Sequence, residues 1–76
     1  MSLLEAYELA NSSEHKAYDF YDGALPNISD PEVHSMFVRL RDEEAQHIRM
    51  IEESIATLPP EAKTEPFFDP DESPAL

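Results

Sequence analysis

The stretch Pro26-Asn27-Ile28-Ser29-Asp30-Pro31 decides the fold, because it separates the two longest proline-free parts of the chain. Pro26 disfavours helix at the residue before it, and the polar residues that follow suit a turn. Asp30 then supplies an N-cap and Pro31 occupies the first helical position, which together signal the start of a helix. The sequence therefore predicts two helices, within residues 1–25 and 31–58, joined by a short turn.

Each predicted helix carries one apolar stripe when its residues are placed about 100° apart. The first stripe contains Leu3, Tyr7, Ala10, Ala17, Tyr21 and Leu25, and the second contains Val33, Met36, Phe37, Leu40, Ile51, Ile55 and Leu58. Two helices cannot hide both stripes from water, whereas two such pairs packed face to face can. We expect an all-α protein in which residues 1–58 form an antiparallel two-helix hairpin that dimerises into a four-helix bundle.

Residues 59–76 have a different composition from the two predicted helices. They begin with Pro59-Pro60, which ends the second helix, and the rest of the segment is rich in proline and in acidic residues. We expect a mostly irregular tail, anchored on the hairpin or on a neighbouring chain by Phe67-Phe68, because two adjacent aromatic side chains are costly to leave in water.

Size and composition narrow the functional classes. The chain has 76 residues and 41% hydrophobic residues, and its 17 acidic against 5 basic residues give a net charge of −12. Such acidity argues against nucleic acid and anionic membranes as partners. No run approaches the length of a membrane span and no secretory signal is visible, so we expect a cytoplasmic protein. The absence of cysteine excludes disulfides, zinc ribbons, iron–sulfur clusters and thiol nucleophiles.

Three ionisable residues interrupt the apolar stripes. Glu14 lies in the first stripe, and Glu44 and His47 lie in the second, one helical turn apart on the same face. Counted from the turn at about 1.5 Å per residue, the two interruptions fall at the same level within roughly one turn. Burying unpaired charge costs several kcal/mol. A bound metal would compensate this cost, and an internal hydrogen-bonded pair is the alternative; Glu43 lies only at the edge of the stripe.

Pairing two chains makes the metal hypothesis more specific. Two copies of Glu14, Glu44 and His47 give four carboxylates and two imidazoles, which is the ligand set of di-iron carboxylate bundles. Two divalent cations would neutralise the four carboxylates. Oxygen-rich ligands with one nitrogen per metal favour iron, with manganese as the alternative, over structural zinc.

The same residues resemble a known family. The pattern Ala10-x-x-x-Glu14-x-x-Ala17-x-x-Phe20-Tyr21, followed by Asp30-Pro31-Glu32-Val33, Phe37, Leu40, Glu43-Glu44 and His47, resembles the rubrerythrin branch of the ferritin-like superfamily. Members usually hold four helices in one chain. With one half of that pattern, this chain is similar to the two-helix encapsulated ferritins, which build a di-iron site across a subunit interface.

The resemblance implies that Glu14, Glu44 and His47 are both the iron ligands and the catalytic residues of a ferroxidase, with two iron ions per dimer. The reaction would be oxidation of Fe(II) by dioxygen or peroxide. Without cysteine there is no rubredoxin-type electron-transfer site. The resemblance also admits an encapsulin shell as a partner and compartment, although the terminal Asp71-Glu72-Ser73-Pro74-Ala75-Leu76 does not resemble the Gly-Ser-Leu type of targeting peptide.

Two other functional classes stay open at this point. An acidic helical hairpin could bind a partner protein, with its Glu–His layer fixing the register of the helices, as polar core residues do in some coiled coils. A metal-binding protein without turnover would bind iron but would not oxidise it. Metal content, the oxidation rate and the oligomeric state distinguish these classes.

Overall fold

The computed structural model describes residues 1–64, and every element in that part of the chain is helical. Helix α1 spans Leu3–Ala24, a 3₁₀ turn η1 spans Leu25–Asn27, helix α2 spans Pro31–Ala56, and one further turn of helix, α3, spans Glu61–Thr64. The predicted all-α class is therefore confirmed for the described residues. No helix among them is long and apolar enough to cross a membrane.

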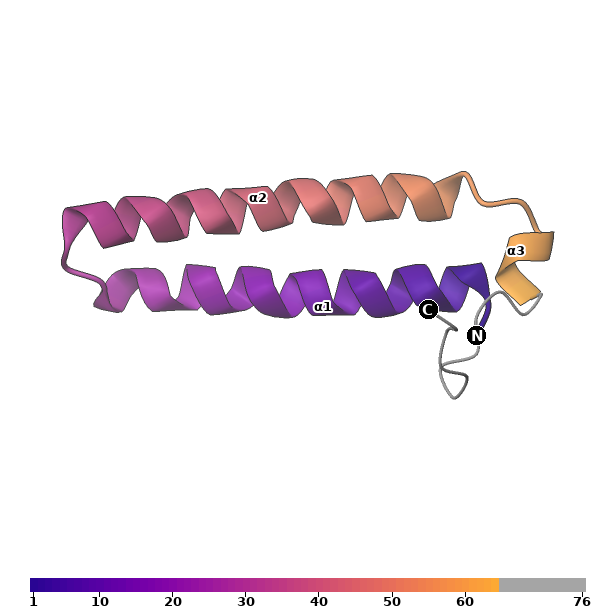
Figure 1. Ribbon diagram of the computed structural model, residues 1–76, viewed down its shortest axis with the longest axis horizontal. Coiled ribbons are helices and arrows are strands. Elements are labelled where there is room, and N and C mark those ends of the chain that lie inside the picture. The colour runs from indigo at the N-terminus through magenta and orange to yellow at the C-terminus, as the bar shows by residue number, and fades with distance from the viewer. Residues whose placement is uncertain (65–76) are drawn as a thin grey trace, which may run out of the picture.

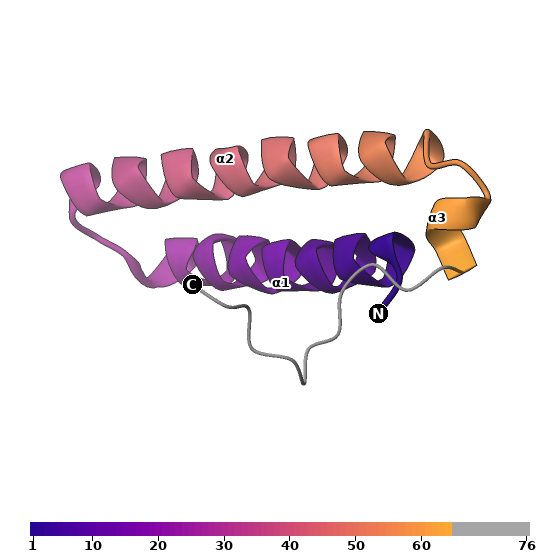
Figure 2. The same cartoon turned by 45° about the vertical axis from the view of Figure 1, so that its right-hand side comes forward.

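Helices α1 and α2 lie side by side and run in opposite directions over nearly their whole length (Figure 1). The view turned by 45° shows the same arrangement (Figure 2). The result is an elongated layer rather than a globule. Its radius of gyration is 16.3 Å, against about 11 Å for a compact chain of this length.

Both long helices begin at a capping residue, and the cap of α2 is the one that the sequence predicted. Ser2 and Glu5 form a reciprocal capping box at the start of α1, where the Glu5 backbone N–H donates to Ser2 Oγ at 3.1 Å. Asp30 caps α2 by accepting a hydrogen bond from the backbone N–H of Val33 at 2.9 Å. These contacts satisfy backbone N–H groups that have no partner within a helix.

The helix ends differ slightly from the prediction. Helix α2 stops at Ala56 rather than Leu58, because Pro59 disfavours helix at the residue before it, and the Leu58 N–H donates to the Ile55 carbonyl three residues back instead of four. The Thr57 hydroxyl donates to the carbonyls of Glu53 and Ser54 in this last turn. The tail was expected to be mostly irregular from residue 59, yet its residues 61–64 form α3, which contacts α1. The expected Phe67-Phe68 anchor lies outside the described residues.

The contact between the two helices does not form a closed core. Among residues 1–64 no hydrophobic residue is fully buried, and Ser2 is the one buried polar residue. Three residues that the stripes placed in the core, Ala10, Val33 and Met36, are exposed. This agrees with the expectation that two helices alone cannot hide both stripes from water; burial of these residues in a four-helix bundle stays a prediction.

The best-defined apolar contact lies near the turn end of the pair. The Tyr21 ring packs edge-on against Phe37 with centroids 5.6 Å apart, and Phe20 stands 6.3 Å from the same ring. Such T-shaped aromatic pairs add to the stability gained from area burial. Phe20 nevertheless stays 61% exposed, so much of this ring still faces solvent.

One side of the helix pair is charged. On it, Arg41 of α2 meets Asp22 of α1 at 3.1 Å, and His15 of α1 stands 4.0 Å from Glu52 of α2. Counted at about 100° per residue, all four residues point to the same side of the plane that contains the two helix axes. We call this surface the charged side.

The opposite side carries exposed apolar residues, which are Leu9, Phe20, Met36 and Met50. Around the axis of α1, Leu9 and Phe20 point about 120–140° away from Glu14, in the sense opposite to the charged residues. Around the axis of α2, Met36 and Met50 point about 80–120° away from Glu44, again in the sense opposite to the charged residues. Because the helices are antiparallel, turns in the same sense lead to the same side of the layer. We call this surface the apolar side.

Candidate metal centre

The structure brings together the three residues that interrupt the apolar stripes. Glu14 projects from the middle of α1, and Glu44 and His47 project from consecutive turns in the middle of α2. One ligand atom from each residue lies within 4.8 Å of the others. This is the one group of three or more histidine and acidic residues with such spacing in residues 1–64.

The individual distances show how close the cluster already is. His47 Nδ1 lies 3.2 Å from Glu14 Oε2, which is hydrogen-bonding distance, and 3.7 Å from Glu44 Oε2. The contact between Glu14 and His47 joins residues that are 33 positions apart in the sequence. The predicted agreement in level between the two helices therefore holds.

The burial of the cluster is uneven. The side chain of Glu44 is 18% exposed, that of Glu14 is 29% exposed and that of His47 is 52% exposed. From Glu44, His47 turns back by about 60° around α2, which is the sense that leads to the apolar side. The most exposed member of the cluster, His47, therefore points toward the apolar side.

Glu44 has a carboxylate oxygen that the protein does not satisfy. Its Oε2 atom is inaccessible to solvent and has no hydrogen-bond partner among the described residues. Leaving a buried acceptor unpaired costs about 1–3 kcal/mol, and more for a charged group. A cation beside this oxygen would remove the cost. Two carboxylates and one imidazole are also a suitable donor set for iron or manganese, so the residues present fit such an ion.

The remaining histidines of the described residues, His15 and His34, lie outside the cluster. His15 faces Glu52 on the charged side, where both side chains are more than half exposed. His34 lies near the start of α2, three turns before His47. Tyr18, which is one turn from Glu14, forms no hydrogen bond with the cluster within residues 1–64.

A polar residue next to the cluster was missed by the sequence reasoning. Asn11, one turn before Glu14 on α1, has a buried Oδ1 atom without a hydrogen-bond partner among the described residues. It lies outside the apolar stripe of the wheel, so nothing in the sequence pattern marked it as partly covered. Its position about 60° around α1 from Glu14, toward the charged side, keeps it out of the ligand group.

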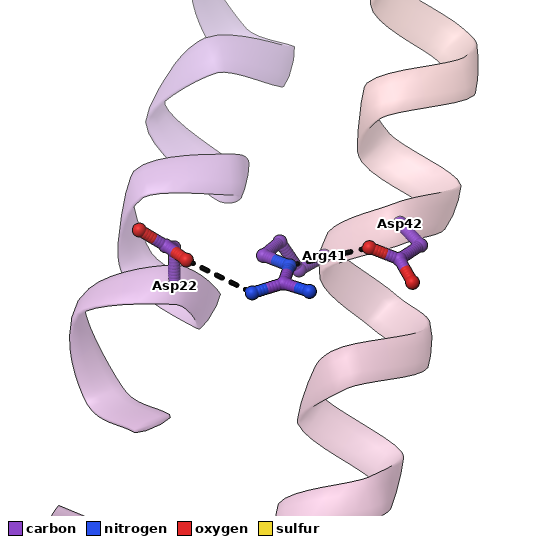
Figure 3. Close-up of polar contacts among 3 residues, drawn as sticks. All are labelled: Asp22, Arg41 and Asp42. Atoms are coloured by element: carbon purple, nitrogen blue, oxygen red, sulfur yellow. Dashed lines mark hydrogen bonds and ion pairs between the residues drawn. The ribbon is translucent and has the colours of Figure 1, made fainter. Parts of the chain in front are cut away.

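A salt-bridge network holds the two helices together one turn from the cluster (Figure 3). The Arg41 guanidinium reaches across from α2 to Asp22 at 3.1 Å and also contacts its neighbour Asp42 at 3.2 Å. The hydrogen bonds with Asp22 and then Asp42 raise the pKa of Arg41 above its ordinary value, so its charge is stable. Arg41 precedes Glu44 by three residues and connects the helices on the charged side.

Comparisons with protein-family models, with curated proteins and with solved structures give no match to this chain. The class of protein that fold and site define is therefore limited to a helical protein with a Glu–Glu–His cluster between two antiparallel helices. Its function is inferred from the chemistry of that cluster.

Proposed function

We propose that two chains pair through their apolar sides to form a four-helix bundle, and that the paired clusters bind and oxidise iron(II). Support for pairing comes from the apolar side. Leu9 is 60% exposed, Phe20 61%, Met36 42% and Met50 63%. Exposed apolar residues that gather on one side of a protein mark interaction sites, and these four lie on the side to which His47 points.

The single chain leaves the apolar side uncovered, because each of these four residues is exposed. A second copy is the simplest partner, because it also carries the groups that the cluster lacks.

Pairing doubles the ligand set to four carboxylates and two imidazoles. Two divalent cations would then balance the four negative charges, which explains how so many ionisable groups can share one buried layer. Glu14 and Glu44 would supply oxygen ligands and His47 one nitrogen ligand per ion. The ferritin-like resemblance of the sequence agrees with this arrangement.

Iron is the substrate in this proposal, and the protein holds two ions where they can react together. Two Fe(II) ions supply the two electrons that, with two protons from solvent, reduce dioxygen to hydrogen peroxide or hydrogen peroxide to two water molecules, so release of one-electron products is avoided. The four carboxylates balance the four positive charges of two Fe(II) ions and offset four of the six charges of two Fe(III) ions. The observation that carries the proposal is the inaccessible, unpartnered Oε2 of Glu44 in a cluster whose His47 points toward the apolar side.

The test combines stoichiometry and turnover. Protein loaded anaerobically with Fe(II) should bind two ions per dimer by elemental analysis and native mass spectrometry, and should then oxidise them when oxygen or peroxide is added. Glu44→Gln should lose most bound iron and nearly all of the oxidation rate. Glu53→Gln, which removes an exposed carboxylate from the same helix, is the matched control. Oxidation by Glu44→Gln at the parental rate would refute the assignment.

A metal-free role is favoured by one specific observation. The hydrogen bond between His47 and Glu14 already pairs two members of the cluster without an ion. A bundle that uses this pair to fix helix register would bind another protein and would need no metal. Such a protein would show no change in melting temperature when Fe(II), Mn(II) or Zn(II) is added, whereas the proposed centre is stabilised by a metal that binds it.

A further inference from the structure

The exposed apolar residues are spaced symmetrically about the metal cluster. Leu9 and Phe20 are eleven residues apart, and the midpoint between them falls beside Glu14. Met36 and Met50 are fourteen residues apart, and the midpoint between them is Glu43, beside Glu44. Both helices therefore place the cluster at the centre of a pair of exposed apolar side chains.

The spacing also keeps each pair on one face of its helix. Eleven residues make about three helical turns and fourteen make about four, at roughly 3.6 residues per turn. Leu9 and Phe20 thus form one stripe on α1, and Met36 and Met50 form one stripe on α2. Val33, which is 38% exposed, extends the second stripe toward the start of α2.

Symmetry of this kind has a structural meaning. In a dimer with two-fold symmetry, residue i of one chain contacts residue j of the partner, and residue j contacts residue i in turn. A two-fold axis that crosses the helices at the level of the cluster exchanges positions at equal distances on either side. Such an axis would bring Leu9 opposite Phe20 of the second copy, and Met36 opposite Met50.

We propose that the second copy lies antiparallel on the apolar side, with α1 on α1 and α2 on α2, about a two-fold axis through the Glu14–Glu44 layer. The inference rests on the proposed function only in taking a second copy as the partner. Because the axis passes through the cluster, the two sets of ligands meet at one level. Any other position of the axis along the helices would separate them.

The arrangement predicts a particular cost at its centre. Glu43 is exposed in the single chain and lies midway between Met36 and Met50, so the two copies of Glu43 would face each other across the axis. Like charges at close approach repel even in water, at about 1 kcal/mol for 4 Å. Glu43→Gln should therefore tighten the metal-free dimer about fivefold, whereas Glu53→Gln on the outer face of α2 should not.

Cysteine cross-linking tests the register directly, because the full-length chain contains no cysteine. Facing positions on helices packed about 8–10 Å apart bring Cα atoms within disulfide reach. Two positions eleven residues apart on one helix are about 16 Å apart and cannot be bridged within a chain. Leu9→Cys with Phe20→Cys should therefore give a covalent dimer on mild oxidation, and Met36→Cys with Met50→Cys should do the same.

The single variants are the controls for this experiment. Leu9, Met36 and Met50 are exposed, whereas Phe20 also stands 6.3 Å from Phe37 across the contact between α1 and α2, so circular dichroism verifies that each variant retains its helices. The inference holds if both double variants cross-link and no single variant does. It is overturned if the double variants stay monomeric under denaturing electrophoresis, or if a single variant cross-links as well as its double.

Metal analysis of the same samples separates this inference from the proposed function. Cross-linked dimers that bind no iron would support the register and reject the di-iron assignment. Iron-binding dimers that do not cross-link at these positions would reject the register and leave the di-iron assignment standing.

Discussion

Replacing Glu44 by methionine should stabilise the metal-free protein while removing its response to metal. Glu44 Oε2 is inaccessible to solvent and unpartnered in the described residues, and the side chain is only 18% exposed. Methionine has a similar length and helix propensity, so the change mainly deletes the unsatisfied acceptor. The expected gain is about 1–3 kcal/mol, less a few tenths for the partly exposed contact with His47.

The assay is thermal unfolding at one fixed protein concentration, first with a chelator and then with Fe(II) under anaerobic conditions. For a domain of this size, 1 kcal/mol corresponds to a change in Tm of about 4–8 °C, so Glu44→Met should melt at least about 3 °C above the parent in chelator. Metal at one hundred times its Kd should stabilise the parent by about 2.7 kcal/mol. Glu44→Met should show none of that increase.

Glu53→Met is the matched control, because it makes the same change at an exposed position of α2. Its free energy of unfolding should stay within about 0.5 kcal/mol of the parent value in both conditions. The reasoning is refuted if Glu44→Met is less stable than the parent in chelator, since the buried oxygen then carries no cost. A full metal-induced shift in Glu44→Met would show that Glu44 is not a ligand.

Three further changes test the fold. Gly23→Ala should stabilise the protein by up to about 1 kcal/mol in urea unfolding, because a Cβ atom there meets no atom within 4 Å and the residue lies inside α1 with no positive φ; a loss of stability would contradict this. Ser2→Ala should cost about 1 kcal/mol by removing the capping box, measured in the same way, and Ser2→Asp should recover most of it. Asp22→Asn should lower the stability only slightly, because the pair with Arg41 is partly exposed. The raised pKa of Arg41 means that its stabilising charge is present below its ordinary pKa and lost only as the pH rises through the raised value. The difference between parent and Asp22→Asn should therefore stay constant from about pH 6 to about pH 10, and a marked fall within that range would be inconsistent with the pair.

The order of the helices could be predicted from a few residues with strong local preferences. Asp30 and Pro31 set the start of α2, and Pro26 set the end of α1, because capping and the missing proline N–H act within a few residues. The shared level of Glu14 and Glu44 also followed from counting residues away from the turn. Local preferences of this kind do not depend on which surfaces meet later.

The exposure of individual apolar residues could not be predicted in the same way. A helical wheel gives the direction of a side chain but not how many neighbours its helix has. Val33 and Met36 belong to a stripe that a four-helix bundle would cover, yet a single chain leaves them exposed. The covered Oδ1 of Asn11 was missed for the related reason that burial depends on which surface the second helix covers.

The absence of any fully buried hydrophobic residue in residues 1–64 has a consequence for the life of the chain in a cell. In residues 1–64 the one long helix–helix contact is that of α1 with α2, so we expect a newly made chain to open often, and proteolysis follows the population of open forms. If pairing supplies the missing core, assembly and degradation compete for the same chain. The rate of degradation is first order in the concentration of single chains, whereas the rate of pairing is second order. The amount of protein that accumulates would therefore rise steeply with its rate of synthesis.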